Sequence, residues 1–272
     1  MKIIADCANG AAYKILPQIL SELGAKVVSI AVSPDGFNIN DGCGSTNPEK
    51  AQKAVLENSA DLGICLDGDA DRVLFIDEQG LLANGDQVLG LLAKAWMKKN
   101  LLNKNTVVAT VMSNLALELY LEKIGVGLIR TQVGDKNVSK SMNREGLNLG
   151  GEQSGHLIMA DYSNAGDGLI TSLQVLSVLV ESQKKASEVF NLFKPFPQSL
   201  INIDAQKCND FEKNEQIKNR LEDVERSLIG KGRILIRRSG TENVIRLMVE
   251  HREKNKLQET IDTCLSILKK KS

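Results

Sequence analysis

This sequence lacks three features that would place it in a specialised class of protein. Neither sign of charge is in excess, because Lys and Arg together number 34 and Asp and Glu also number 34. This balance argues against a general binder of nucleic acid or of acidic membranes. The longest apolar stretch, GLITSLQVLSVLV, is too short and too polar to span a bilayer, and MKIIADCANG is no signal peptide because its sixth residue is an acid. We therefore expect a cytoplasmic protein that contacts neither a membrane nor nucleic acid.

Cysteine and histidine are also scarce. The five cysteines are odd in number and form no C-x-x-C pair, which favours reduced thiols over a disulfide framework or a zinc site. The chain has only two histidines, and a single histidine is more often structural than functional. His251 closes the strand-like run VIRLMVEH, so we expect it at the surface.

Short β-branched runs alternate with helical patterns through most of the chain. KIIAD, KVVSIAV, LGICLD, TVVATVM and VGLIRTQ read as strands, and the segments between them carry helical periodicity. One of these helices is PEKAQKAVLEN, where Asn47 is predicted as the capping residue and Pro48 as the first helical residue. The alternation predicts an α/β fold with two domains, whose mixed or mostly parallel sheets are covered by helices.

The segment FKPFPQ, residues 193–198, contains two of the five prolines and reads as a linker. Beyond it the order changes to strand, helix, two close strands and helix, which predicts a smaller α+β domain at the C-terminus. The last helix should carry one apolar face, made of Leu257, Ile261, Leu265 and Leu268. We thus expect three domains, at residues 1–82, 83–197 and 198–272.

The stretch DGDADR places Asp67, Asp69 and Asp71 at alternate positions directly before Arg72. Strand-like runs on both sides hold this loop in one shape, and like charges held together need a cation. An EF-hand has the same spacing, but its sixth loop position requires glycine where Arg72 stands, and its flanks are helices. A tight loop with three monodentate carboxylates instead suits Mg²⁺, with Arg72 as a counter-charge and a donor to phosphate.

A second polar loop, GGEQSGH, covers residues 150–156. Glu152 can accept hydrogen bonds from two sugar hydroxyls, Ser154 can donate or accept, and the glycines let the backbone approach a ligand. His156 lies beside them in a loop without apolar periodicity. This setting favours contact with a polar ligand over a structural role for His156.

A third loop, RRSGTEN, joins two apolar strands. Arg237, Ser239, Gly240 and Thr241 offer a guanidinium, two hydroxyls and backbone N–H groups, which together can form an anion nest. Arg246 adds a second guanidinium from the following strand. In order along the chain, the three loops predict metal, polyol and phosphate binding, which is the composition of a phosphosugar site.

These loops resemble those of the α-D-phosphohexomutase superfamily, namely its metal loop D-G-D-x-D-R, its sugar loop G-E-x-S-G-H and its phosphate loop R-x-S-G-T-E. The runs DCANGAA, NDGCGSTNPE, VGDK and GDGLITSLQ are most similar to the members that act on glucosamine phosphate. The resemblance implies an isomerase in which a phosphoserine gives its phosphoryl group to a hexosamine phosphate. The resulting 1,6-bisphosphate then turns around, and its other phosphate returns to the serine.

The resemblance also implies a role for each candidate residue. Asp67, Asp69 and Asp71 would hold Mg²⁺ against the phosphoserine, while Arg72 and His156 would lie at the reacting hydroxyl. Lys136, Glu152 and Ser154 would contact the sugar, although the family usually has Arg-Tyr where this chain has Lys136 and Asn137. The non-reacting phosphate would be held by Arg237, Ser239, Gly240, Thr241 and Arg246. Asn243, which stands where the family usually has proline, would only loosen this loop.

One expected part of the family is not found in these 272 residues, namely a first domain with a serine in a T-x-S-H-N-P loop. The run GSTNPE at Ser45 lacks the histidine and resembles another stretch of the second domain, so Ser45 is not expected to be the nucleophile. The chain therefore resembles domains two to four and reads as a shortened chain or as one piece of a split enzyme. We expect a companion N-terminal domain and no turnover by this chain alone.

Two alternatives and one question of assembly stay open. The sugar loop does not distinguish an amine from a hydroxyl, so a mutase of mannose or glucose phosphate is the first alternative. The second is a phosphosugar-binding module without catalytic activity. A homodimer is also left open.

Overall fold

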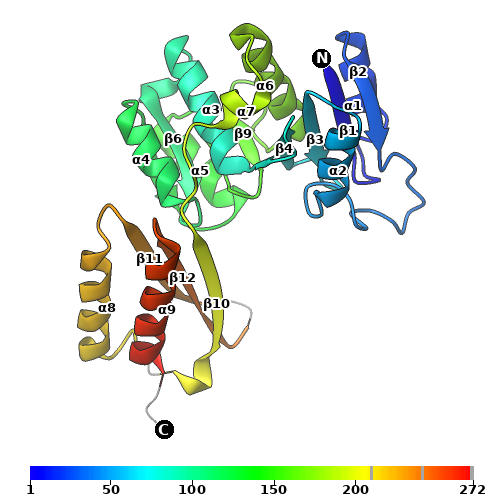
Figure 1. Cartoon of the computed structure of the whole chain (residues 1–272). Helices are drawn as coiled ribbons and strands as arrows, with labels where there is room; N and C mark the ends of the chain where they lie inside the picture. Colours follow the sequence, from blue (N-terminus) through cyan, green and yellow to red (C-terminus); the bar gives the residue numbers. More distant parts are fainter. Residues whose placement is uncertain (209–210, 240–241, 270–272) are drawn as a thin grey trace. The chain divides into compact units, whose positions relative to one another are not determined.

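The computed structural model describes residues 1–208, 211–239 and 242–269. These residues form two compact units (Figure 1). The first unit comprises Met1–Ser113 with Leu117–Phe193, and the second comprises Asn114–Ala116 with the chain from Lys194 onward. The chain passes from the first unit to the second between Phe193 and Lys194. This position lies at the start of the proline-containing segment that the sequence marks as a linker.

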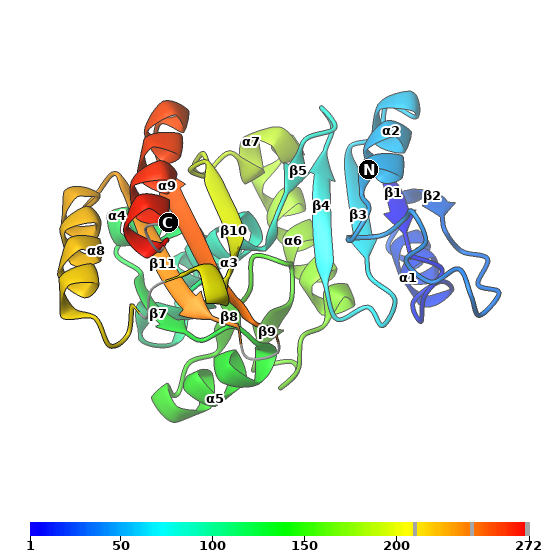
Figure 2. The ribbon, with the colours of Figure 1, turned by 90° about the horizontal axis from the view of Figure 1, so that it is seen from below.

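The first sheet contains five strands in the order β2-β1-β3-β4-β5, which lie side by side in Figure 2. Their bounds are β1 (Lys2–Asp6), β2 (Lys26–Ile30), β3 (Leu62–Leu66), β4 (Val73–Asp77) and β5 (Leu82–Ala83). β1 runs parallel to both β2 and β3, whereas β4 runs antiparallel to β3 and β5. The sheet is therefore mixed, as the sequence predicts.

Helices pack on both faces of this sheet because alternate strand residues point to opposite sides. Ile4 and Ile76 pack against Val55 of α2 (Glu49–Glu57) on one face. Ile3 and Phe75 belong to the larger core on the other face, which includes Leu20 of α1 (Ile15–Glu22). All six side chains are at most 1% exposed, so the sheet is covered on both sides.

The helix predicted after Asn47 exists, but the predicted cap is wrong. α2 begins at Glu49 and its N-cap position is Pro48, which makes no side-chain capping hydrogen bond. The Asn47 side chain instead donates to the carbonyl of Asn40 at 3.4 Å. The Asn47 amide N–H thus contacts the preceding loop, and the helix begins without a side-chain cap at its N-cap position.

The second sheet of the first unit has the order β7-β6-β8-β9. Its strands are β6 (Thr106–Thr110), β7 (Gly127–Thr131), β8 (Leu149–Gly151) and β9 (Leu157–Met159). β6 is parallel to β7 and β8, and β8 and β9 form an antiparallel hairpin. The remaining helices of this part of the chain are α3 (Gly85–Lys98), α4 (Leu115–Lys123), α5 (Asp135–Glu145), α6 (Gly168–Ser182) and α7 (Ala186–Phe190), and a 3₁₀ turn spans Asn103–Asn105. Of these, α5 packs on the second sheet, whereas α6 and α7 contact β4 of the first.

Two of these helices begin at strong capping residues, which explains why the chain turns into a helix there. The Asn84 side chain accepts from the N–H groups of Asp86 and Gln87, and the Gln87 side chain accepts from the Asn84 N–H, so α3 starts with a capping box. Asp167 accepts from the N–H groups of Leu169 and Ile170 at the start of α6. These caps fix both helix starts close to the loops that form the candidate site.

The second unit contains a three-stranded antiparallel sheet in the order β10-β12-β11. Its elements are β10 (Gln198–Asp204), a 3₁₀ turn (Ala205–Lys207), α8 (Glu215–Ser227), β11 (Gly232–Arg238), β12 (Val244–His251) and α9 (Lys254–Leu268). α8 and α9 lie on one face of the sheet (Figure 1). Buried side chains of both helices meet Ile245, Leu247 and Val249 of the central strand.

The predicted apolar face of α9 is confirmed, because its four leucine and isoleucine positions all belong to this core. The prediction for His251 is wrong, since that residue is only 5% exposed. Its Nδ1 accepts from the N–H of Glu253 at 2.9 Å, which joins the end of β12 to the start of α9.

The whole arrangement confirms an α/β chain with mixed sheets and a smaller C-terminal α+β part. Among the described residues, no helix has the length and apolar character that a membrane crossing requires.

Candidate functional site

The loop between β3 and β4 brings the three alternate aspartates together. One carboxylate oxygen from each of Asp67, Asp69 and Asp71 lies within 4.8 Å of the other two. Asp67 is buried, whereas Asp69 is exposed. The flanking strands are paired antiparallel to each other, so an EF-hand is excluded by the fold as well as by Arg72 at the turn.

The charges in this loop are only partly compensated by the protein. Burial is the main cause that raises the pKa of Asp67 to about 6, and the neighbouring Asp71 and Asp69 add to it. The Nε of Arg72 lies 3.8 Å from an oxygen of Asp67 and 3.8 Å from Oδ1 of Asp71, and that Oδ1 is buried without a hydrogen bond. Three convergent carboxylates with one unpaired buried oxygen fit a divalent cation.

The metal loop and the sugar loop are joined by backbone hydrogen bonds. Arg72 and His156 form an antiparallel β-bridge, and the N–H of Val73 donates to the carbonyl of Gly155 at 3.1 Å. Gly155 has φ +94°, and a Cβ there would lie 2.3 Å from the Val73 carbonyl oxygen. Only glycine therefore permits this pairing, which makes the two loops one structure.

A second pair of hydrogen bonds reinforces this arrangement from the ends of two helices. The N–H of Gly168, at the start of α6, donates to the carbonyl of Ala70 at 2.8 Å. The N–H of Gly85, at the start of α3, donates to the carbonyl of Gln153 at 3.0 Å. Each loop is thus held by the first residue of a well-capped helix.

His156 lies beside the aspartate cluster. Its Nε2 is 3.4 Å from Oδ2 of Asp71, and its side chain is 7% exposed. Gly166 covers the ring so closely that a Cβ there would lie 2.3 Å from Nε2. The imidazole is therefore fixed with one nitrogen directed at the carboxylates.

The remaining sugar-loop residues differ in their surroundings. Oε1 of Glu152 accepts from the N–H of Gly134, just before α5, at 2.8 Å, so one of its two oxygens already has a protein partner. Ser154 is exposed. The predicted pairing of Glu152 with two hydroxyls at once thus competes with a bond inside the protein.

Lys136 and His156 both line a cavity of about 480 Å³. It is also lined by Ser139 and Lys140 from the same face of α5, and by Asn164. These three residues are not among those predicted from the sequence. The spacing of three and four residues from Lys136 is the helical signal that would have indicated Ser139 and Lys140. The cavity combines two ammonium groups with the imidazole next to the aspartates, which suits an anionic polyol.

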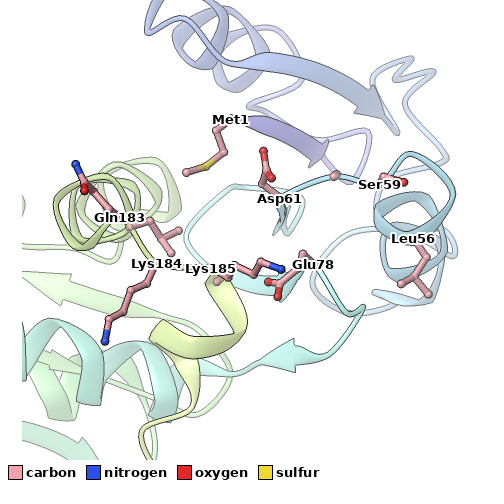
Figure 3. Close-up of a pocket in the computed structure, with 11 residues that line it drawn as sticks. Met1, Leu56, Ser59, Asp61, Glu78, Gln183, Lys184 and Lys185 are labelled. Carbon is pink, nitrogen blue, oxygen red and sulfur yellow. The ribbon is translucent and has the colours of Figure 1, made fainter.

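A second hollow of about 580 Å³ lies at the opposite end of the first sheet (Figure 3). It is lined by Met1, Asp61 just before β3, Glu78 just after β4, and Lys185, whereas the metal loop connects the other ends of these strands. Glu78 accepts from the hydroxyl of Ser187 at 2.5 Å and from its N–H at 3.0 Å. In this hollow, α7 is thus hydrogen-bonded to the end of β4, and the hollow is separate from the carboxylate cluster.

The third predicted loop lies in the second unit. Arg237 and Arg246 are directly opposite each other in the β11–β12 ladder. The Ser239 N–H donates to the Val244 carbonyl at 2.9 Å, and its hydroxyl accepts from the N–H of Glu242. Arg246 donates to Glu242 at 3.0 Å, and its Nε is buried without a hydrogen bond. Gly240 and Thr241 lie outside the described residues.

Comparison with protein families gives three matches in consecutive order. Residues 1–80, 84–196 and 200–265 match the family models of phosphoglucomutase/phosphomannomutase domain II, domain III (both alpha/beta/alpha) and the C-terminal domain, respectively. The fold is also similar to solved structures. One is a phosphoglucomutase/phosphomannomutase family protein from Burkholderia thailandensis, with a TM-score of 0.80 at 21% identity over 98% of this chain and 60% of that one. Another is Aspergillus fumigatus N-acetylphosphoglucosamine mutase in complex with GlcNAc-6P and magnesium, with a TM-score of 0.77 at 19% identity over 98% of this chain and 61% of that one.

Curated relatives are similar at a higher level of identity. Phosphoglucosamine mutase of Zymomonas mobilis is 52% identical over 262 residues, which are 96% of this chain and 59% of the relative. Phosphoglucosamine mutase of Granulibacter bethesdensis is 50% identical over 268 residues, which are 98% of this chain and 58% of the relative. The chain thus spans about three fifths of the length of these relatives. With these domains matched in order along nearly its whole length, the chain belongs to the phosphoglucomutase/phosphomannomutase family, and its named relatives are phosphoglucosamine mutases.

Proposed function

We propose that this chain is the metal-, sugar- and phosphate-binding part of a phosphoglucosamine mutase, which interconverts glucosamine 6-phosphate and glucosamine 1-phosphate. The observation that carries the proposal is the β-bridge between Arg72 and His156. It brings the carboxylate cluster next to the cavity that contains Lys136, Lys140 and His156. A phosphorylated polyol is the ligand class that needs a cation, ammonium groups and hydroxyl-binding groups in one place.

Asp67, Asp69 and Asp71 would hold Mg²⁺, which would neutralise charge on the transferred phosphoryl group. Arg72 would donate to the oxygens of the same phosphoryl group, since its guanidinium is exposed beside the carboxylates. His156, directed at Asp71, would contact the hydroxyl that receives the phosphoryl group and would orient it.

The sugar would lie against the loop after β8 and the start of α5. Oε2 of Glu152 and the exposed hydroxyl of Ser154 would bind sugar hydroxyls, because Oε1 of Glu152 is engaged by Gly134. Lys136 would donate to hydroxyl or phosphate oxygens from the cavity wall. Arg237, Ser239 and Arg246 would hold the non-reacting phosphate, with Gly240 and Thr241 as the remaining members of that loop.

The phosphoryl donor of the proposed reaction is a phosphoserine from a segment outside these 272 residues. It would transfer its phosphoryl group to the free hydroxyl of the sugar phosphate, giving a 1,6-bisphosphate. After the bisphosphate has turned around, the serine would take back the other phosphoryl group. Between the two transfers the C-terminal loop would release one phosphate and bind the other. Charge neutralisation and positioning would supply most of the rate enhancement, as in phosphoryl transfer generally.

Sugar-phosphate binding by the purified chain tests this proposal. In calorimetry with Mg²⁺, glucosamine 6-phosphate should bind more tightly than glucose 6-phosphate or mannose 6-phosphate. Lys136→Ala and Glu152→Gln should weaken that binding, whereas Lys26→Ala in β2 should not. Tighter binding of mannose or glucose phosphate would assign the chain to another member of the family. No binding of any sugar phosphate would contradict the proposal.

Turnover distinguishes an enzyme part from a binding module. The chain alone should show no mutase activity, because the proposed donor serine is not among its residues. Measurable Mg²⁺-dependent conversion by the 272-residue chain would contradict this expectation. Joined to a serine-bearing first domain of a relative, it should turn over glucosamine phosphate, and a fusion that binds without turnover would favour a non-catalytic module.

A further inference from the structure

The loop between β2 and α2 presents a phenylalanine almost entirely to solvent. Phe37 is 96% exposed and Ile39 is 50% exposed. The other five phenylalanines are buried or half-buried, for example Phe75 at 0% and Phe190 at 3%. A large aromatic side chain left in water at this position needs an explanation other than the core of this chain.

This loop is braced by its own hydrogen bonds. Oδ1 of Asp35 accepts from the N–H groups of Phe37 and Asn38 at 2.8 and 2.9 Å. The Asn38 side chain accepts from the N–H of Asp35 and donates to the Ser33 carbonyl. Asn9, just after β1, accepts from the Ser33 N–H and donates to the Asn38 carbonyl. The Phe37 side chain is therefore presented by a fixed backbone, which lowers the entropy cost of burying it in a partner.

The same loop contacts the metal loop directly. Gly68 lies between two of the clustered aspartates, and a Cβ there would be 2.5 Å from Cγ2 of Ile39 and 3.0 Å from Nδ2 of Asn40. The carbonyl of Gly68 accepts from the N–H of Ala11 at 2.8 Å. Oδ1 of Asn40 is buried without a hydrogen-bond partner. The exposed apolar residues are thus attached, through Ile39 and Asn40, to the loop that would receive the phosphoryl donor.

We propose that the loop of residues 33–42 is the docking surface for the polypeptide that carries the phosphoryl-donor serine, with Phe37 inserted into an apolar pocket of that polypeptide. The inference rests on the proposed function, which needs a serine at the carboxylate cluster. Two further observations support this occupant. The curated relatives extend well beyond the matched region, since it covers 59% of the Zymomonas mobilis protein. The Asp35 and Asp41 carboxylates flank Phe37 on exposed residues, so the complementary surface would be apolar with a basic rim.

The test uses the whole 272-residue chain and, as the probe, the part of the Zymomonas mobilis relative that lies outside the match, made as a separate polypeptide. Calorimetry should show binding, and Phe37→Ser should weaken it about tenfold or more, as expected for an aromatic anchor. The matched control is Val180→Ser, because Val180 is also exposed, at 66%, but lies on α6. This control should bind as the unchanged chain does.

A second measurement covers the case in which the separate polypeptide binds weakly. With the same segment joined to the chain in one polypeptide, Phe37→Ser should lower mutase kcat/KM about tenfold or more relative to Val180→Ser. Equal values for the two variants in both measurements would overturn the docking surface. Analytical ultracentrifugation gives a second way to overturn it. If the unchanged chain is a dimer and Phe37→Ser dissociates that dimer, the occupant of the surface is a second copy of this chain.

Binding of glucosamine 6-phosphate to the chain alone separates the two ideas. Phe37→Ser should leave that binding unchanged. If the sugar phosphate binds and Phe37 has no effect on either measurement, only the docking surface fails. If no sugar phosphate binds to the unchanged chain, the proposed function fails, and the docking surface that rests on it fails as well.

Discussion

Arg237 and Arg246 lie directly opposite each other in the antiparallel ladder of β11 and β12, on the face of the sheet that α8 and α9 leave uncovered. Like charges at such a position repel each other, which disfavours the folded state. Glu242 accepts from Arg246, but the pair still carries an excess of positive charge. A bound phosphate dianion would compensate that excess with charge-assisted hydrogen bonds.

Arg237→Lys should therefore weaken binding of glucosamine 6-phosphate although the charge is kept, because the planar two-pronged donor is lost. A loss of about 1.5–3 kcal/mol is expected for one charge-assisted contact. Mg²⁺ binding and the free energy of unfolding should stay within about 0.5 kcal/mol of the unchanged chain. Calorimetry and urea denaturation measure these quantities, and Arg220→Lys on exposed α8 is the control. An Arg237→Lys chain that unfolds but binds normally per folded molecule would make the arginine structural.

Asp69→Ala should weaken Mg²⁺ binding and at the same time slightly stabilise the metal-free chain. The reason is that the substitution removes one of three carboxylates whose oxygens lie within 4.8 Å of one another, and clustered like charges are destabilising. Thermal denaturation with and without Mg²⁺ should show a smaller metal-induced rise in Tm than for the unchanged chain. Glu57→Gln, on the exposed side of α2, should leave that rise unchanged. A dissociation constant below about 1 µM for the unchanged chain would contradict the expectation that a phosphoserine completes the site.

Ser187→Ala should change how stability depends on pH. Burial alone would raise the pKa of Glu78, but hydrogen bonds, first among them the one from the Ser187 hydroxyl, and the charge of Lys185 lower that pKa below its ordinary value of 4.5. The variant removes the hydroxyl bond and keeps the bond from the N–H. A lowered folded-state pKa stabilises the protein above pH 4.5 and loses that contribution as the pH falls through the folded pKa. The variant should thus be less stable by about 1 kcal/mol at pH 7, and this difference should shrink below pH 4.5. Urea denaturation at several pH values measures it. A difference that does not depend on pH would contradict the assignment, and Ser266→Ala should show no pH-dependent change.

Gly155→Ala should be much more harmful than Gly125→Ala, although both glycines have a positive φ of +94° and +77°. A Cβ on Gly155 would meet the carbonyl of Val73 at 2.3 Å, whereas nothing lies within 4 Å of one on Gly125. The backbone conformation alone costs about 1–2 kcal/mol in each case, and the clash at Gly155 should add about 2 kcal/mol or more. Chemical denaturation gives the difference, and Mg²⁺ affinity should also fall for Gly155→Ala alone. Equal costs would mean that the two loops are not held by this contact.

The fold and the individual loops could be predicted from local sequence, because strand and helix periodicity and turn composition are local properties. Asp67, Asp69 and Asp71 come together as expected, since they are neighbours in one short loop between paired strands. The bridge between Arg72 and His156 could not be predicted, because it depends on how two sheets pack in three dimensions.

Other features escaped prediction because residue type and periodicity do not specify which backbone groups come near a side chain. His251 is the last residue of an apolar strand, at what looks like an exposed end, yet it is buried and accepts from the N–H of Glu253 just before α9. Asn47 has the right residue type for a helix cap, but a loop carbonyl takes its side chain. Lys140 enters the cavity only because α5 lies beside the loop that carries His156. In each case the deciding contact depends on the path of the backbone in three dimensions, even where the partner is near in the sequence, as Glu253 is to His251.

The contact of Gly155 with Val73 and that of Gly168 with Ala70 also constrain how genes of this family can be recombined. In sequence, residues 1–82 and 83–197 look like independent cassettes with a convenient crossover between them. In three dimensions, Gly155 leaves no room for a Cβ against the carbonyl of Val73, and Gly168 leaves little room against the carbonyls of Ala70 and Arg72. A hybrid with its crossover near residue 82 would have to keep both glycines in its second part and a metal-loop backbone of compatible shape in its first part, so these contacts limit which two parts can be combined.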